Sequence, residues 1–377
     1  MREELLQATE EICPILEQWQ GWGEANGRLA DDVVAALRGM GIAKLCLPEA
    51  LGGYEVDPVT TALICQRLAD SDPSAAWFVM VFNAARLMSA GWPEETLERL
   101  FLDQPDIMLA ASGHTAMQGR VTDSGFSVSG RNSFVSGCHH ADYIMSPMMV
   151  EERPYFVVLP AAQCQVVDNW DTLGMRGTGS NDVIAEDVQI PSVLAIPTDK
   201  PAQRSKYHSG RLYNCPSRVV FATYIPAALS LARRALTELE DLAANKVPYA
   251  SDGKLKLRSQ AQMHYGRALA KYRATRAYFL TSLEEVWSAA DDDKVFHASE
   301  RADLYLAGTH TMQTCAEIVR HVADAAGSTV FHKGQPLERI ARDMETLKHH
   351  GFANESRYAS VAQALWDAPL DYPLMMR

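Results

Sequence analysis

Three segments of the sequence bring together residue types that can do chemistry, and the first is Phe134–Tyr143 (FVSGCHHADY). A strand that ends in Ser136 and Gly137 places a hydroxyl group beside a flexible backbone, which a flat ligand can approach closely. A hairpin turn with a solvent-facing serine explains the same pattern. His139 and His140 point to opposite faces if they lie on a strand, and no carboxylate or cysteine cluster lies near them at zinc-like spacing. We therefore expect no metal site.

A glycine-rich segment, Trp170–Asp182 (WDTLGMRGTGSND), is the second candidate. Its Gly174, Gly177 and Gly179 make a loop whose backbone amides can meet a phosphate group or the edge of a ring. The segment lacks the Lys-Ser/Thr ending and the following helix of a P-loop, and it does not match the dinucleotide-binding fingerprint. A turn between two strands is the alternative interpretation.

The third candidate is the segment Arg342–His350 (RDMETLKHH), near the start of the last predicted helix. A histidine with an ordinary pKa of about 6.5 is a natural proton acceptor near neutral pH. His349 and His350 lie about 100° apart on a helix, so at most one of them lines a given cavity. A surface histidine or a hydrogen-bonded core histidine is the alternative. Serine-hydrolase chemistry is excluded because the sequence contains no G-x-S-x-G motif.

The sequence periodicity around these segments predicts an α+β protein with three parts. Residues 1–106 have helical periodicity, and the apolar segment 75–90 within them is expected to be buried or to line a cavity. Residues 107–205 alternate with period two between turn residues, which predicts a central antiparallel β-barrel or sandwich. Residues 206–377 predict a C-terminal four-helix bundle. Its amphipathic segments cover about 215–246, 256–289, 297–326 and 336–366.

Charge and cysteine content narrow the class of protein. The 377 residues include 47 acidic and 35 basic side chains, a net charge of −12, which argues against nucleic acid or an anionic membrane as the main partner. The seven cysteines are far apart and odd in number, as expected for reduced thiols in a cytoplasm. The most apolar stretch, Ala75–Phe82, is much shorter than the about 20 residues of a membrane span. We expect a soluble cytoplasmic protein.

Taken together, four motifs in this order resemble the acyl-CoA dehydrogenase fold superfamily over nearly the whole chain. They are Leu47–Tyr54 (LPEALGGY), Phe134–Ser136, Trp170–Ser180 followed by Asp187–Pro191, and Arg342–Asp343. The resemblance implies a helical N-terminal domain, a β domain and a C-terminal four-helix bundle that enclose a flavin in a homotetramer.

Within this superfamily, the sequence is similar to the oxygenase components of two-component flavin monooxygenases. Acyl-CoA dehydrogenases carry a catalytic glutamate shortly after Arg-Asp, whereas residues 348–353 read KHHGFA, and Glu355 is a poor match in context. The oxygenase pattern is present as Ser136–Asp142 (SGCHHAD), Gly177–Ser180 (GTGS) and His350 seven residues after Asp343. Such enzymes take reduced FMN or FAD from a separate NAD(P)H:flavin reductase. With O2 they form a C4a-hydroperoxyflavin that hydroxylates an aromatic or heteroaromatic molecule, such as an indole or a polyketide.

The resemblance also implies roles for individual residues. Ser136 would form a hydrogen bond with flavin N5, Trp170 would pack against the isoalloxazine ring, and Arg258 would bind the flavin phosphate. The implied flavin-binding residues are Ser112, Phe134, Ser136, Gly137, Trp170, Ser180, Arg258, Gly327 and Ser328, of which Gly327 and Ser328 approach the flavin of a neighbouring subunit. The implied catalytic residues are His350, Ser136 and His349, and the implied substrate-binding residues are Trp77, Asn83, Ser112 and His350.

Asn83 departs from the pattern, because many relatives place a histidine at this point of the apolar helix. An amide cannot act as a base near neutral pH, so proton abstraction falls on His350 alone. Two other functions stay open. One is an acyl-CoA dehydrogenase-type flavoenzyme that oxidises an acyl thioester, and the other is a non-enzymatic flavin binder.

Overall fold

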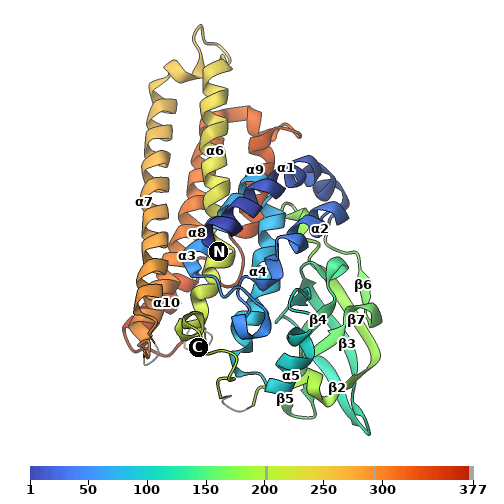
Figure 1. The fold of residues 1–377 in the computed structure, drawn as a ribbon. Coiled ribbons are helices and arrows are strands. Elements are labelled where there is room, and N and C mark those ends of the chain that lie inside the picture. The colour runs from blue at the N-terminus through green and yellow to red at the C-terminus, as the bar shows by residue number, and fades with distance from the viewer. Residues whose placement is uncertain (200–202, 292–293, 373–377) are drawn as a thin grey trace.

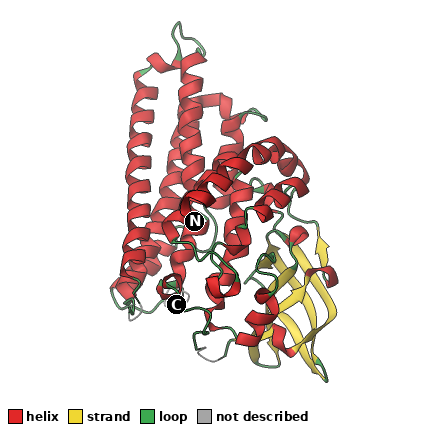
Figure 2. Cartoon of the chain, in the orientation of Figure 1, coloured by secondary structure: helices red, strands yellow, loops and turns green. Residues whose placement is uncertain are grey.

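The computed structural model describes residues 1–199, 203–291 and 294–372, and it consists of helices, then a sheet, then helices again. The N-terminal and C-terminal helices pack together, and the strands form a separate layer beside them (Figures 1 and 2). One hydrophobic core joins the two sets of helices, and a second core lies at the sheet. Val135, Cys138 and Met175 come from the sheet region but belong to the helical core, so the sheet meets the helices at the ends of strands.

Two Asp-Pro pairs start the helices that matter most in the N-terminal part. Asp57 and Asp72 accept hydrogen bonds from the backbone N–H of Thr60 and Ser74, and the proline that follows each aspartate occupies the first helical position. The second of these helices, α4, is buried on nearly all sides, as its apolar sequence predicts. The elements are α1 (Arg2–Asn26), α2 (Asp31–Gly39), η1 (Ile42–Lys44), η2 (Glu49–Leu51), α3 (Pro58–Ser71), α4 (Pro73–Met88), η3 (Ser89–Gly91), α5 (Glu94–Leu97) and η4 (Glu98–Leu102).

The described strands form one eight-stranded mixed sheet in the order β6-β7-β3-β2-β4-β5-β8, with β1 paired to β4. Both β1 and β2 run parallel to β4, whereas the other neighbours are antiparallel. The predicted antiparallel barrel or sandwich is therefore wrong for the pairings of β1 and β2 with β4, whereas the other described pairs are antiparallel. Period-two alternation shows that one face of a strand is buried, but it carries no information about the direction of the neighbouring strand. The strands are β1 (Leu109–Ala111), β2 (Met117–Thr122), β3 (Gly125–Val135), β4 (Tyr143–Val150), β5 (Arg153–Pro160), β6 (Gln165–Val167), β7 (Asn181–Pro191) and β8 (Ala195–Pro197).

The last predicted helix, 336–366, is two helices, α9 (Pro336–Leu347) and α10 (Arg357–Leu365). A turn between them contains Gly351, and both helices bury apolar residues, so the hydrophobic periodicity continues across the break. His350 consequently lies in a turn and not on a helix. The other C-terminal elements are η9 (Arg211–Asn214), η10 (Ser217–Thr223), α6 (Ile225–Asn245), η11 (Leu255–Leu257), α7 (Ser259–Ala289), α8 (Ala298–Ala326) and η12 (Gly327–Phe331).

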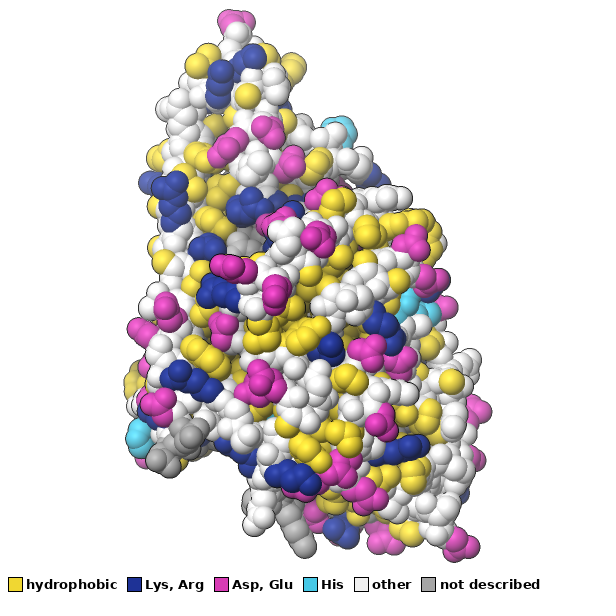
Figure 3. Space-filling model, in the orientation of Figure 1, with side chains coloured by type: hydrophobic (Ala, Val, Ile, Leu, Met, Phe, Trp, Pro, Cys, Tyr) yellow, Lys and Arg dark blue, Asp and Glu magenta, His cyan; other side chains and the backbone are white. Residues whose placement is uncertain are grey.

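One described segment, Ser217–Asn245, is long and apolar enough to cross a membrane by length and composition. It comprises η10 and α6, and 89% of its apolar window is buried inside the protein. These apolar side chains are therefore covered by neighbouring helices, which is typical of a core helix. On the surface, Figure 3 shows acidic and basic side chains interspersed over the visible face.

Candidate active site

The end of β3 turns sharply, and the turn separates an aromatic ring from a hydroxyl group. Phe134 has a left-handed backbone (φ 60°), which is unusual for a residue other than glycine and marks a strained position. The residue is 54% exposed, and its ring lies 6.1 Å from the ring of Trp170 and 5.0 Å from that of His114, centroid to centroid. Ser136, two residues later, is only 7% exposed. The strained turn therefore leaves an aromatic surface outside and places the serine hydroxyl inside.

Ser136 belongs to a chain of hydrogen bonds whose direction can be deduced. Thr178 Oγ1 donates to Met175 O (2.8 Å), so Ser180 Oγ must donate to Thr178 (2.8 Å) and Ser136 Oγ to Ser180 (2.6 Å). Trp77 Nε1 donates to Ser136 Oγ (3.1 Å). Since a hydroxyl oxygen has two lone pairs, Ser136 can accept one further hydrogen bond.

The glycine-rich loop is held against α9 by the Arg342-Asp343 pair. Met175 N–H donates to Asp343 Oδ1 (2.6 Å), and Arg342 Nη1 donates to Leu173 O (2.7 Å). A Cβ on Gly174 would lie 2.3 Å from Arg342 O, so only glycine allows this approach. Trp170 Nε1 also donates to Met175 O (3.1 Å). The pair therefore positions the whole loop, including Trp170 and the hydroxyl chain that ends at Ser136.

Asp343 lies in a buried cluster of opposite charges. Its carboxylate is 3.5 Å from Arg339, which also lies 3.7 Å from Asp72 at the start of α4. Burial raises the pKa of Asp343 to about 6, although Arg339 and the hydrogen bond from Met175 oppose this shift. Burial also raises the pKa of Asp72. The cluster ties α9, α4 and the glycine-rich loop together at one point.

His350 lies in the turn after α9, inside a cage of aromatic rings. Its ring centroid is 5.1 Å from Trp77, 5.3 Å from Tyr224 and 4.9 Å from Phe352. Its Nδ1 accepts a long hydrogen bond from Phe352 N–H (3.5 Å). Burial lowers the pKa of His350 to about 4, with a smaller contribution from the charge of Arg218. The imidazole is therefore neutral near pH 7 and can accept a proton.

Trp77 connects the two halves of the site. Its indole N–H is bonded to Ser136, and the edge of its ring contacts His350. Helix α4 supplies Trp77, the end of β3 supplies Ser136, and the turn after α9 supplies His350. Several other predicted residues border this centre: Phe134, Gly137, Trp170 and Ser180, together with Ser112, whose Oγ donates to Ser133 O (2.6 Å) beside Phe134.

Two predicted residues have other roles. The His349 side chain is 71% exposed and lies 3.4 Å from Glu345, so it points into solvent and not toward His350's aromatic cage. Asn83 is fully buried, and its amide bonds Cys46 N–H, Ile42 O and Val79 O. The bonds to Cys46 and Ile42 fasten the segment before η2 to α4, and both side-chain N–H groups of Asn83 are used within the protein.

Arg258, Gly327 and Ser328 lie at the far end of the C-terminal helices. Lys246, at the end of α6, accepts from Leu255 N–H through its carbonyl and donates through Nζ to Ala326 O (2.6 Å). The start of α7 and the end of α8 are thus close together, at the opposite end of the molecule from the sheet (Figure 1). All three residues are exposed, and within one chain the helix ends that carry them lie apart from the strand β3 that precedes Ser136.

His139 and His140 lie on the short turn η5 (Cys138–His140), and not on a strand. His139 Nε2 is 2.8 Å from Asp168, whereas His140 Nε2 contacts Leu29 O at 3.1 Å. Burial lowers the pKa of His140 to about 4. The two rings therefore have separate partners, and no group of three potential metal ligands occurs among the described residues.

Sequence reasoning missed Thr178 and Tyr224. Thr178 is inside the recognised Gly-Thr-Gly-Ser motif, and it links the Ser180 hydroxyl to the carbonyl of Met175. Tyr224 carries no local signal, because only the packing of η10 against α4 brings its ring to Trp77 (5.7 Å).

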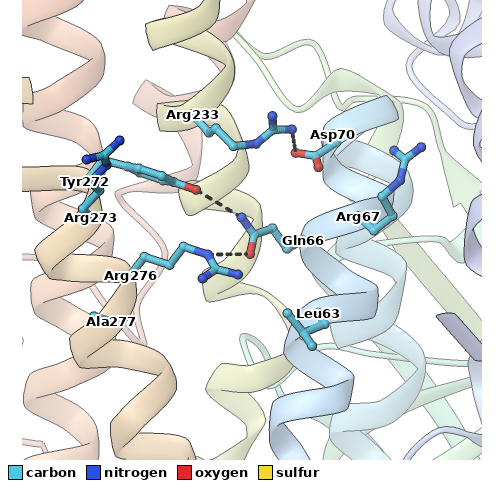
Figure 4. Close-up of a pocket in the computed structure, with 9 residues that line it drawn as sticks. All are labelled: Leu63, Gln66, Arg67, Asp70, Arg233, Tyr272, Arg273, Arg276 and Ala277. Atoms are coloured by element: carbon cyan, nitrogen blue, oxygen red, sulfur yellow. Dashed lines mark hydrogen bonds and ion pairs between the residues drawn. The ribbon is translucent and has the colours of Figure 1, made fainter. Parts of the chain in front are cut away.

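A separate pocket of about 550 Å³ lies between α3, α6 and α7 (Figure 4). Arg233 pairs with Asp70 across it (2.7 Å), and Gln66 bridges Arg276 and Tyr272 (3.3 Å each). These polar contacts hold α3 to the C-terminal helices. None of the residues predicted to bind flavin or substrate lines this pocket. Its lining residues are Leu63, Gln66, Arg67, Asp70, Arg233, Tyr272, Arg273, Arg276 and Ala277.

Comparison with known proteins defines the class. Residues 2–96 match the N-terminal domain of acyl-CoA dehydrogenase, and residues 222–355 match its C-terminal domain. The two matches together span more than half of the chain, in the order that the motifs predict. The chain belongs to the acyl-CoA dehydrogenase family.

Comparison with individual relatives shows which branch of the family this chain resembles. It is 28% identical to an indole-3-acetate monooxygenase of Acinetobacter baumannii, over 92% of this chain and 90% of that protein. It is 25% identical to the flavin-dependent monooxygenase oxygenase subunit HsaA of Rhodococcus jostii, over 94% and 96%. Its fold matches XiaF from Streptomyces, solved with FADH2 and glycerol, with a TM-score of 0.91, 22% identity and coverage of 99% and 97%. The predicted resemblance to flavin-dependent oxygenase components is confirmed.

Proposed function

We propose that this protein is the oxygenase component of a two-component flavin-dependent monooxygenase that hydroxylates an aromatic or heteroaromatic substrate. The observation that carries the proposal is the arrangement around Trp77, with the buried Ser136 hydroxyl on one side and the neutral His350 imidazole on the other. This arrangement joins a flavin-facing hydroxyl to a proton acceptor in an apolar cage.

The residues at the end of β3 fit a reduced flavin. The exposed Phe134 and the half-buried Trp170 offer aromatic surface for a planar ring, and Gly137 has a left-handed backbone (φ 72°) that disfavours a side chain. The N5–H of a reduced flavin is a hydrogen-bond donor, and Ser136 has a lone pair left to accept it. When bound, the reduced flavin supplies the activation of O2 for transfer of one oxygen atom.

The protein's own residues then have distinct tasks. The hydroxyl chain from Ser136 to Met175 O keeps the Ser136 oxygen available as an acceptor. The rings of Trp77, Tyr224 and Phe352 pack around His350 and limit its contact with water, although the residue is only partly buried. His350 accepts the proton that an aromatic hydroxyl or ring N–H loses when the ring is attacked.

The proposal includes a homotetramer, in which α6 to α9 make up the family's four-helix bundle. Arg258 directly precedes α7, and Gly327 and Ser328 directly follow α8, at the end of these helices that lies opposite the sheet (Figure 1). In a tetramer they would complete the flavin site of a neighbouring subunit, with Arg258 at the flavin phosphate. A separate NAD(P)H:flavin reductase would supply reduced FMN or FAD in the cytoplasm.

A rapid-mixing experiment tests the function. Anaerobic protein loaded with reduced FMN is mixed with oxygenated buffer, and the absorbance of oxidised flavin is followed with and without indole. We expect oxidised flavin to appear much later than it does from free reduced FMN, and hydroxylated indole to form. Immediate reoxidation without product would contradict the proposal. Bleaching of oxidised bound flavin by an acyl-CoA would instead favour thioester oxidation.

A further inference from the structure

The pocket between α3, α6 and α7 carries an excess of positive charge. Four of its nine lining residues are arginines, and Asp70, which pairs with Arg233, is the acidic residue among them. Its volume of about 550 Å³ lies in the range of pockets that bind small organic molecules. Because none of the predicted flavin- or substrate-binding residues lines this pocket, its charge has to be explained apart from the proposed active site.

Two of the four arginines have no acidic partner among the described residues. Arg67 pairs with Glu10 (2.7 Å), whereas Arg273 and Arg276 form no ion pair within the described parts of the chain. These two residues are three apart on α7 and therefore lie on the same side of the helix, where like charges repel. Arg276 Nε donates to Gln66 Oε1 (3.3 Å), which leaves the N–H groups on both Nη atoms for another acceptor.

The Tyr272 hydroxyl, in the same pocket, has a proton that the described residues do not use. Arg276 Nε can only donate, so the Gln66 atom that faces it is the oxygen, and Gln66 Nε2 donates to Tyr272 Oη (3.3 Å). Tyr272 is only 8% exposed, and no described residue accepts its O–H. Burial raises the pKa of Tyr272, although Arg276 opposes this shift, so the hydroxyl keeps its proton. A buried O–H without an acceptor indicates a ligand or a water.

The α7 side of the pocket is therefore suited to an anion. Tyr272 and Arg276 extend from α7 toward Gln66 on α3, so their donors converge between the two helices (Figure 4). Arg273, which is exposed, lies at the rim, where a ligand can enter. Two guanidinium groups and a hydroxyl match a phosphate group, which has several acceptor oxygens and up to two negative charges.

We propose that this pocket is a second ligand site, separate from the proposed flavin site, in which Arg276, Arg273 and Tyr272 bind the phosphate group of a small molecule. A phosphate monoester and free phosphate present the same charged group to these donors. A monoester also fills the remaining volume of the pocket with its organic part, whereas free phosphate leaves most of it to water. The inference does not rest on the proposed function, because binding at this site needs neither flavin nor turnover.

Calorimetric titration of the full chain with glycerol 3-phosphate and, separately, with inorganic phosphate tests the site. Neither probe is aromatic, so neither resembles the flavin ring or the proposed substrate. We expect wild type to bind glycerol 3-phosphate with a Kd below about 1 mM, and Arg276→Gln to weaken this binding about tenfold through the loss of a charged donor. Tyr272→Phe should weaken it about fivefold through the loss of one hydrogen bond.

Arg267→Gln is the matched control, because it removes the same charge from an exposed residue of α7 that does not line the pocket. Its affinity should differ from that of wild type by less than about twofold. Glycerol 3-phosphate should raise the melting temperature of wild type and Arg267→Gln much more than that of Arg276→Gln, since a ligand stabilises the folded state in proportion to its occupancy.

The outcomes separate the sources of the phosphate group and can overturn the inference. Tighter binding of glycerol 3-phosphate supports an organic ligand, and equal binding of both probes supports free phosphate. The inference is wrong if neither probe binds wild type saturably, or if Arg276→Gln and Arg267→Gln have equal effects. Phosphate bound at the proposed flavin phosphate site gives another pattern, in which Arg258→Ala loses binding and Arg276→Gln retains it, and this result also overturns the inference.

Discussion

At the scale of single residues, the site depends on how Ser136 shares its hydrogen bonds. The hydroxyl donates to Ser180 and accepts from Trp77, so one acceptor position is left for the flavin. Ser136→Ala removes this position, and we expect oxidised flavin to appear about tenfold sooner after mixing with O2, as for loss of one useful hydrogen bond. Ser127→Ala on the same strand is the control, because its hydroxyl bonds Asp187 away from the site. Equal behaviour of the two variants would contradict the role of Ser136.

The lowered pKa of His350 predicts how the hydroxylation activity depends on pH. Its pKa is lowered from the ordinary 6.5 to about 4, so the imidazole gains its proton only as the pH falls through about 4. A protonated imidazole cannot accept a proton, so activity should be lost in that range and should stay level between about pH 5 and pH 7. A pH–rate profile at saturating reduced FMN and substrate measures this. Loss of activity near pH 6.5 would show that His350 is not shielded as the structure indicates. His350→Gln should remove most of the hydroxylation but retain flavin binding.

At the scale of elements, the glycine-rich loop and α9 act as one unit. A methyl group on Gly174 would meet the backbone of Arg342 at 2.3 Å, and backbone atoms cannot rotate away. We expect Gly174→Ala to lower the free energy of unfolding by about 3 kcal/mol, at the upper end for overpacking, and to weaken flavin binding. Chemical denaturation and flavin titration measure the two effects. Gly266→Ala on α7 is the control, because its added methyl meets nothing within 4 Å and alanine favours the helix. A stable Gly174→Ala variant would show that the loop is not packed on α9.

At the scale of the whole molecule, the flavin site is expected to need two subunits. Arg258 directly precedes α7, at the end of the C-terminal helices opposite the sheet (Figure 1), whereas Ser136 directly follows strand β3. We therefore expect the two residues to serve one flavin only if they come from different chains. We expect Arg258→Ala and Ser136→Ala proteins to bind reduced FMN poorly or hold it briefly when separate. After subunit exchange, mixed tetramers should regain some wild-type sites, because each variant supplies what the other lacks.

Light scattering of the unmixed protein must first give the mass of four chains. Flavin retention after exchange is then compared with that of the same variants incubated separately. Mixed tetramers that regain no flavin retention would show that Arg258 does not contribute to a neighbouring site.

Much of the fold was present in local sequence patterns. The apolar segment 75–90 predicted a buried helix, and α4 is buried because nearly all of its side chains are apolar. The Gly-Thr-Gly-Ser loop and the Arg-Asp pair were visible as motifs. The helical N- and C-terminal parts and the kinship with flavin-dependent oxygenase components were predicted from the motifs and their order, and they are confirmed.

Only the tertiary structure decided how these pieces meet. It showed that strands β1 and β2 run parallel to β4 and that α9 ends before His350. It also showed that the Asn83 side chain is hydrogen-bonded to backbone groups. It also joined Asp343 to Met175, 168 residues apart in the sequence. Periodicity and turn residues report on the conformation of a few neighbouring residues, because they act through local sterics and burial. Strand direction, helix breaks with continuous periodicity and the partner of a buried hydroxyl depend on contacts between distant segments, which form only when the whole chain packs.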